Sequence, residues 1–226
     1  MIAEPKSARH RILETAHDLF YRDGVRATGV DRLIAEARVT KVTFYRHFPS
    51  KDDLIRAFLE YRHEKWMRWF REALTCNRLR QNERARRDEP LAPLAAALAE
   101  WFAQPSFRGC AFINSVAEIG GALPDATAIA ARHKAEMIAE IETLLPQDRP
   151  DRAIVAQAAA LAADGAIVRA QTSKAASRDA IASLRHVLGA LTRLHDTPPA
   201  IKRAASPRRR QKLSTENVRT KSSRTT

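Results

Sequence analysis

Residues 37–54, with the sequence ARVTKVTFYRHFPSKDDL, constrain this chain most, because their capping residues fix where helices begin and end within eighteen positions. Thr40 can accept a hydrogen bond from a backbone N–H two or three residues later, which starts a helix. Pro49 ends that helix, and Ser50 caps the next one, with Asp53 as a weaker form of the capping-box partner. The segment predicts a short helix and, almost without a loop, the start of a second one.

The short helix after Thr40 is expected to be basic on one side and apolar on the other. The outward set is Lys41, Thr43 and Arg46, and the inward set is Val42, Phe44 and Phe48. Basic side chains and hydroxyls on an exposed helix suit the phosphates and base edges of a DNA duplex.

Two further amphipathic helices are expected upstream. The first spans residues 7–24 and places apolar side chains at i, i+1, i+4, i+7 and i+8 spacing: Ile12, Leu13, Ala16, Leu19 and Phe20. Thr28 is expected to cap the second, whose inward residues are Val30, Leu33, Ile34 and Ala37. Two helices joined as tightly as the second and third form a helix-turn-helix, whose second member enters the major groove.

A set of caps, apolar positions and polar positions agrees with a known family: Thr28, Val30, Leu33, Ala37, Val39, Thr40, Thr43, Phe44, Tyr45, His47, Phe48, Ser50, Lys51 and Leu54. With this pattern, about the first quarter of the chain resembles the DNA-binding domain of the tetracycline-repressor (TetR) family of bacterial transcription regulators. The chain departs from the family at Arg38, where Gly is usual, and at Ile34, where Ala is usual. A left-handed Arg38 would cost about 1 to 2 kcal/mol, so either the turn differs or the guanidinium gains a phosphate contact.

The resemblance implies an all-α protein with a three-helix DNA-binding domain at residues 1–50 and a larger helical effector-binding and dimerisation domain at residues 51–196. The residues expected to face base edges are Thr40, Lys41, Thr43 and Arg46. Those expected to hold phosphates are Thr28, Arg38, Tyr45, His47 and Lys51. The implied partners are a palindromic operator duplex, a small-molecule effector and a second copy of the chain.

Composition agrees with a polyanionic partner. The chain has 39 Lys plus Arg against 26 Asp plus Glu, for a formal charge of +13. Nine of the basic residues and one acidic residue lie in residues 197–226, a segment expected to be a disordered tail that either adds nonspecific DNA affinity or is an inert terminus.

We expect a cytoplasmic protein without a membrane span, because neither a secretory signal nor a long enough apolar run is apparent. Metal-ligand spacings, phosphate-binding loops and catalytic constellations are also not apparent, so we expect no metal, no cofactor and no enzyme activity.

Beyond residue 50 we expect a second helical domain. A long helix should begin at Lys51 and end within residues 77–88, followed by helices near residues 91–103, 110–119, 124–145, 151–172 and 177–195. The segment WFAQPSFRGCAFINSVAEI at residues 101–119 resembles the RGC segment in the ligand-binding domain of one TetR subgroup. The family implies a small-molecule pocket there.

Residues compatible with that pocket are Trp66, Trp69, Phe70, Trp101, Phe102, Phe107, Cys110, Phe112, Asn114 and His133. Aromatic residues at helical spacing also fill ordinary cores, and His133 can be a satisfied core histidine. Cys110 is open to two interpretations: a redox switch with its thiol pKa lowered beside Arg108, or a small buried residue.

The last two helices have broad apolar faces that could form a four-helix bundle with a second copy of the chain, as in the TetR family, or ordinary core. Their residues are Ala158, Leu161, Ala162, Gly165, Val168, Ile181, Leu184, Val187, Leu188 and Leu191. We therefore interpret the chain as a sequence-specific homodimeric regulator, a repressor released by a small apolar or amphipathic effector. The alternatives are a nonspecific architectural DNA binder that depends on the tail, and a basic helical small-molecule enzyme, which would need a titratable cluster that the sequence does not show.

Overall fold

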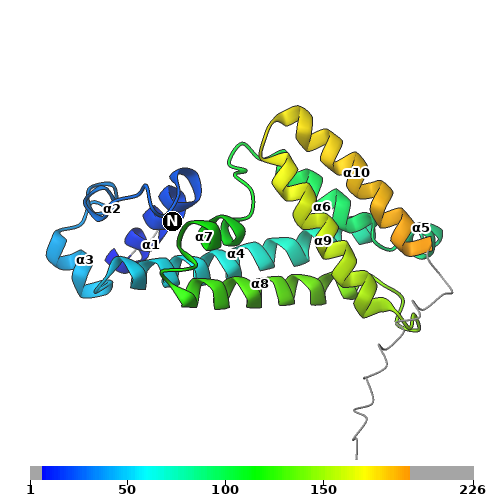
Figure 1. Ribbon diagram of the computed structural model, residues 1–226, viewed down its shortest axis with the longest axis horizontal. Coiled ribbons are helices and arrows are strands. Elements are labelled where there is room, and N and C mark those ends of the chain that lie inside the picture. The colour runs from blue at the N-terminus through cyan, green and yellow to red at the C-terminus, as the bar shows by residue number, and fades with distance from the viewer. Residues whose placement is uncertain (1–6, 194–226) are drawn as a thin grey trace, which may run out of the picture. The chain divides into compact units, whose positions relative to one another are not determined.

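The computed structural model describes residues 7–193, and every regular element in that stretch is an α-helix, as predicted (Figure 1). The helices are α1 (Ala8–Asp23), α2 (Val30–Ala37), α3 (Lys41–His47), α4 (Lys51–Leu79), α5 (Glu83–Asp88), α6 (Ala92–Phe102), α7 (Ala111–Ile119), α8 (Pro124–Glu142), α9 (Arg152–Ala170) and α10 (Lys174–Arg193). The segment interpreted as a basic tail, residues 197–226, lies outside the described residues.

The predicted caps on either side of α3 are confirmed. The Thr40 hydroxyl oxygen accepts the N–H of Thr43 at 3.1 Å, and the Ser50 hydroxyl oxygen accepts the N–H of Asp53 at 3.1 Å. A side-chain cap of this kind stabilises a helix by about 1 kcal/mol. Both ends of the connection between α3 and α4 are therefore fixed by local chemistry.

The cap predicted for α2 is wrong. This helix starts after Gly29 with no side-chain cap. The Thr28 hydroxyl instead donates to the carbonyl oxygen of Gly24 at 2.8 Å, and the residue is fully buried. Thr28 therefore closes the connection between α1 and α2, because its hydroxyl is satisfied within that loop.

Helices α1, α2 and α3, which we call the head, pack on the first turns of α4. The side chains of these helices that are almost fully shielded from water include Ile12, Leu19, Leu33, Phe44 and Leu54. Burying each of them contributes roughly 1.5 to 3 kcal/mol. This small core holds α3 on the head with its other side facing solvent.

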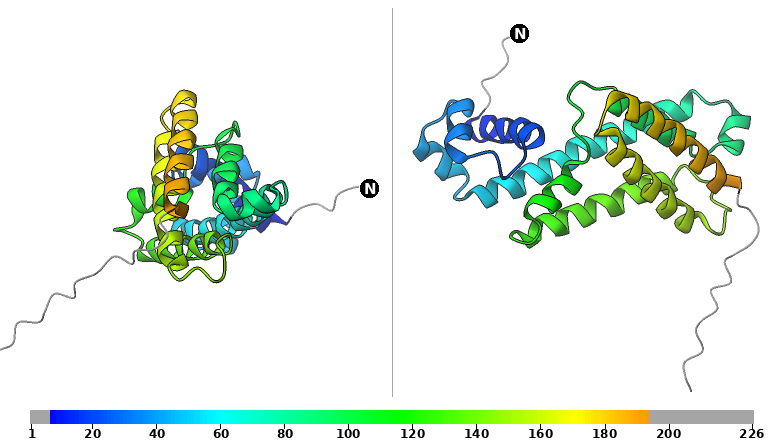
Figure 2. Two further views of the ribbon diagram at one scale, coloured as in Figure 1. Left: turned by 90° about the vertical axis from the view of Figure 1, so that its right-hand side faces the viewer. Right: turned by 45° about the horizontal axis from the view of Figure 1, so that its top comes forward.

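The remaining helices, α4 to α10, form what we call the body. Helix α4 lies along α8, and α7 lies against both (Figures 1 and 2). Helices α9 and α10 pack against each other and against α6, which in turn packs on α4. The body therefore carries a pair of terminal helices, α9 and α10, on a base of α4, α6 and α8.

The start of α10 and the presence of α5 differ from the sequence prediction. Helix α10 begins at Lys174, before the start near residue 177 that the sequence predicted. Ser173 explains the earlier start, because its hydroxyl oxygen accepts the N–H of Ala176 at 3.0 Å in the manner of a helix cap. The charged stretch after α4 also contains a separate short helix, α5, which was not predicted.

Helix α9 is long and apolar enough to cross a membrane by length and composition, contrary to the expectation that no such run exists. Core helices of globular proteins pass the same test, and α9 packs against α6, α8 and α10. The observation is therefore weak evidence for a membrane span.

Candidate nucleic-acid interface and effector cavity

The outer side of α3 presents basic and large side chains to solvent. Lys41, Val42, Tyr45 and Arg46 are all exposed, whereas Phe44 between them is fully buried. These four follow i, i+1, i+4 and i+5 spacing, which places them on one side of the helix. A side chain on this face can enter a groove of DNA without disturbing the head core.

Val42 was expected in the core, and this expectation is wrong, because 69% of the residue is exposed. Phe44 and Phe48 supply the buried side of α3, and they are four residues apart. Val42 lies about 200° around the helix from Phe44, since successive residues are about 100° apart. The signal that could have found it is its i, i+3 and i+4 spacing with Tyr45 and Arg46.

The hydroxyls of Thr40 and Thr43 lie at the start of α3, 2.9 Å from each other. Thr40 is exposed and Thr43 is half-buried. At the other end His47 is half-buried in the last turn. The Tyr45 ring contacts the Phe44 ring edge-on at 5.3 Å between centroids, and 41% of Tyr45 is exposed.

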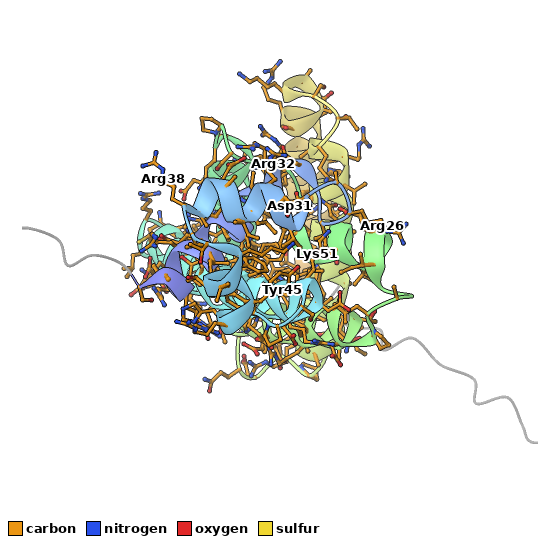
Figure 3. All side chains as sticks on the ribbon, turned by 90° about the vertical axis from the view of Figure 1, so that its left-hand side faces the viewer. Arg26, Asp31, Arg32, Arg38, Tyr45 and Lys51 are labelled. Atoms are coloured by element: carbon orange, nitrogen blue, oxygen red, sulfur yellow. The ribbon has the colours of Figure 1, made fainter. Side chains whose placement is uncertain are left out.

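Arg38 occupies the left-handed conformation that the sequence raised as a possibility, with φ 51° and ψ 53°. The N–H groups of Arg38 and Val39 donate to the carbonyls of Ala35 and Ile34, both at 3.2 Å, the double hydrogen bond of a Schellman turn. The Arg38 side chain is exposed, and within the described part of the chain no ion pair involves it. Figure 3 shows Arg38 at one margin of the head and Arg26 at the opposite margin.

Two residues expected to hold phosphates are engaged inside the protein instead. Thr28 is fully buried, so it offers no hydroxyl to DNA in this structure. The Lys51 amine donates to the carbonyl oxygen of Val25 at 2.7 Å, and partial burial lowers its pKa. Lys51 thereby joins the start of α4 to the connection between α1 and α2 (Figure 3).

Residues predicted for the effector pocket do converge in the body, but they fill the space. Trp66, Trp101, Cys110, Phe112 and His133 surround a cavity of about 10 Å³. That volume holds at most one water molecule. The stacked rings of Phe112 and His133, 3.8 Å apart, show why so little space remains.

Three other pocket candidates lie around or outside this cavity. The Phe70 ring stacks on the Trp66 ring at 4.6 Å, and Trp69 is half-buried beside the same ring. Asn114 is directed elsewhere, because its amide donates to the backbone carbonyl of Arg108 at 3.1 Å. Asn114 is therefore not a polar group of the aromatic cluster.

The aromatic cluster buries several basic groups, and one of them, His63, has its Nε2 3.3 Å from the Oε2 of Glu136. His133 is fully buried, with its Nδ1 3.2 Å from Nδ1 of His63, and burial lowers its pKa to about 2. Arg62 is buried with its guanidinium 3.9 Å above the ring of Tyr21 and an Nη1 atom 3.3 Å from Nε2 of His17. Burial lowers the pKa of Arg62, and no ion pair joins it within residues 7–193.

Cys110 is buried at the start of α7. The guanidinium of Arg108, which was expected to activate its thiol, donates instead to the carbonyls of Pro105 and Phe107 at 3.0 and 2.7 Å. This geometry favours the interpretation of Cys110 as a small buried residue. Among the described residues no group of three or more His, Cys, Asp or Glu side chains could hold a metal ion.

The residues predicted for a dimer interface divide into three groups. Leu161, Gly165, Val168 and Val187 are exposed, with 74% of Leu161 open to solvent. Ala158, Ala162 and Leu191 are half-buried. Ile181, Leu184 and Leu188 are buried within the chain, so they are not part of a free surface.

A tight helix-turn-helix with a solvent-facing second helix, mounted on a larger helical body, defines a class of DNA-binding transcription regulators. Residues 12–58 match the family model described as bacterial regulatory proteins, tetR family. A TetR-family transcriptional regulator from Streptomyces coelicolor is 32% identical, with a TM-score of 0.68 over 83% of this chain and 91% of that one. The chain belongs to the TetR family and is a transcriptional regulator, not an enzyme.

Other relatives agree over shorter or more distant matches. The regulatory protein TetR from Rhodobacter sphaeroides is 25% identical, with a TM-score of 0.64 over 81% of this chain and 98% of that one. The HTH-type transcriptional regulator QacR of Staphylococcus aureus is 28% identical over 102 residues, which are 42% of this chain and 54% of QacR. The HTH-type regulator YuxN of Bacillus subtilis is 37% identical over 60 residues. The chain thus spans about half of QacR and only 21% of YuxN.

Proposed function

We propose that this protein is a homodimeric repressor that binds a palindromic operator through α3 and leaves it when a small molecule binds the body. The observation that carries the proposal is the face of Lys41, Val42, Tyr45 and Arg46, all four of which are exposed to solvent in the described chain. Helices of this size fit the major groove of DNA.

Each side chain on this face suits a different feature of the duplex. Arg46 and Lys41 can donate to the acceptors of guanine, and Val42 can contact the methyl group of thymine. Arg38 and Tyr45 lie where they can reach phosphates, with Thr40 at the start of the helix. One such helix contacts few base pairs, so a two-fold dimer is needed to specify an operator.

The proposed dimer contact is the exposed apolar stripe of α9. Ile154, Leu161 and Val168 follow one another every seven residues and are 59%, 74% and 49% exposed. Ala158 and Gly165 lie between them, and a Cβ atom added at Gly165 would meet nothing within 4 Å. Two copies of this stripe, with Val187 of α10, can form a four-helix bundle.

This function suits a division into a DNA-binding domain at residues 1–50, an effector and dimerisation domain at residues 51–196 and a basic segment at residues 197–226. We place the protein in the cytoplasm, where operator DNA lies. The charge of the last segment, nine basic residues and one acidic, favours added nonspecific DNA affinity.

Selection of bound duplexes from a random pool, followed by fluorescence anisotropy at fixed salt, tests the proposal. We expect a palindromic site bound at least about 1,000-fold more tightly than random DNA. Val42→Ser should reduce the preference for thymine at one position of each half-site. Equal affinity for all sequences would contradict this function and favour the architectural alternative.

A further inference from the structure

The body contains a groove far larger than the cavity in the aromatic cluster. Its volume is about 910 Å³, and it lies between the end of α6, the connection from α6 to α7, and the first half of α10. The apolar side chains that line it include Phe102, Phe107 and Ile181. Small-molecule sites commonly have volumes of about 300 to 1,000 Å³ and apolar walls.

The polar lining of this groove is cationic. Arg108, Lys174, Arg178 and Arg185 line it, and the lining contains no Asp or Glu. Lys174, Arg178 and Arg185 follow i, i+4 and i+11 spacing, so they share one side of α10. Within residues 7–193 none of these three is held in an ion pair, which leaves their charges available to a ligand.

We propose that this groove, rather than the aromatic cluster, binds the effector, and that the effector is an amphipathic organic anion. Its hydrocarbon or aromatic part would lie on Phe102, Phe107 and Ile181, and its carboxylate or phosphate would pair with the cations of α10 and with Arg108. Charge-assisted hydrogen bonds from guanidinium groups are the usual means of binding such anions. The proposal names the ligand class of the repressor proposed above, and its role as an effector rests on that function.

The groove is joined to the head through the backbone of Arg108 and Gly109. The N–H of Arg108 donates to the hydroxyl oxygen of Tyr21 at 3.0 Å, and that hydroxyl donates to the carbonyl of Gly109 at 2.9 Å. Tyr21 belongs to α1 of the head. On its other side, the carbonyl of Arg108 accepts from the amide of Gln171 at 2.9 Å, and Gln171 also lines the groove.

Ligand binding would act directly on the loop that makes these hydrogen bonds to the head. The Arg108 guanidinium now donates to two carbonyls of its own loop, those of Pro105 and Phe107. An anion in the groove competes for the same donors and so frees that loop. Gly109 has a φ of 84°, and a Cβ there would collide with Gln171, so the loop is closely packed where it meets Tyr21.

Isothermal titration calorimetry with decanoate, below its micelle concentration and without DNA, tests the site. We expect decanoate to bind, and decanol and decyltrimethylammonium to bind at least about 10-fold more weakly. Arg178→Glu with Arg185→Glu should lower decanoate affinity by about 10-fold or more, as expected for lost hydrogen bonds to a charged group, and Arg178→Gln should lower it less. Arg87→Glu, an exposed position on α5, is the matched control and should bind as the wild type.

Equal binding of the three probes, no binding of decanoate, or unchanged affinity in the doubly substituted protein would overturn the proposed site.

Anisotropy on the selected operator then tests the effector role. Decanoate should weaken operator binding by about 5-fold to 150-fold, and operator should weaken decanoate binding by the same factor. Tyr21→Phe, which cannot donate to Gly109, should still bind decanoate, but decanoate should weaken its operator binding by a smaller factor than in the wild type. Decanoate that binds without changing operator affinity would overturn the effector role, whereas failure of the unliganded protein to select an operator would overturn the proposed function alone.

Discussion

The exposed face of α3 and the aromatic cluster around His133 use the same kinds of side chain, aromatic rings beside basic groups, in opposite environments. On α3, Tyr45 and Arg46 face solvent, so both side chains are accessible to a partner. In the cluster, burial lowers the pKa of both His133 and Arg62. The comparison teaches that burial, more than residue type, decides whether such a group recognises a partner or fills a core.

The largest expected effect is on the stability of the cluster. Phe112→Ala should lower the free energy of unfolding by about 3 to 5 kcal/mol, because it removes a buried ring stacked on His133. Urea unfolding followed by circular dichroism measures this. Tyr45→Ala on the exposed face is the control and should change stability by less than about 1 kcal/mol. Similar losses of stability in both variants would contradict the difference drawn between the buried cluster and the exposed face of α3.

On the exposed face the effect should appear in DNA binding instead. Arg46→Ala should weaken operator binding by about 1 to 3 kcal/mol and relax the preference at one base pair, if the guanidinium pairs with guanine. Its stability should stay near that of the wild type. Fluorescence anisotropy with cognate and random duplexes measures both the loss of affinity and the loss of base preference. An equal loss of affinity for the two duplexes would indicate that Arg46 contacts phosphates instead of bases.

The cluster should also make stability depend on pH. The pKa of His133 falls from 6.5 in the unfolded chain to about 2 in the fold, so the unfolded state binds the proton first. Stability is therefore highest above pH 6.5 and falls as the pH drops below it, by about 1.4 kcal/mol per unit and about 2 kcal/mol at pH 5.

Unfolding midpoints between pH 7 and pH 5 measure this slope, which should shrink in His133→Gln whatever the starting stability of that variant. A slope remains in the variant because burial also lowers the pKa of His17. His186→Gln, at an exposed position on α10, is the control. An unchanged slope in His133→Gln would show that His133 accepts a proton in the fold.

The smallest expected effect separates stability from recognition at one residue. Arg38→Gly should raise the free energy of unfolding by about 1 to 2 kcal/mol, because glycine adopts the left-handed turn without steric cost. If the guanidinium holds a phosphate, the same variant should bind all duplexes more weakly. Thermal unfolding and anisotropy together measure the two effects, and stabilisation with unchanged DNA affinity would remove Arg38 from the interface.

Features that depend on neighbouring residues, such as the helix caps, were predictable from the sequence. Cavities and grooves formed by segments that are distant in the sequence were not. The caps at Thr40 and Ser50 depend on neighbours within three residues, so the pattern alone locates them. Val42 was misplaced because a seven-residue helix gives too few apolar positions to fix its orientation. Thr28 was misassigned because its hydroxyl has a competing acceptor, the carbonyl of Gly24, within the same loop.

The body shows the same limit. Helical spacing correctly predicted that Trp66, Trp101 and Phe112 face inward, but spacing cannot reveal whether inward side chains leave a void. The larger groove joins the end of α6 to the start of α10, segments more than seventy residues apart. Part of its rim, Lys174, lies before residue 177, near which the last helix was expected to begin.

Helix α7 holds the head from both of its ends. At its start the Arg108 and Gly109 peptides bond to Tyr21, and near its end the carboxylate of Glu118 accepts the N–H of Arg26 at 2.9 Å. Because α7 is hydrogen-bonded to the head near both of its ends, a tilt of α7 would move the head, as would a shift of α7 along its axis. In the dimer proposed above, bound to half-sites one helical turn or about 34 Å apart, a small tilt of α7 would be magnified at the second recognition helix.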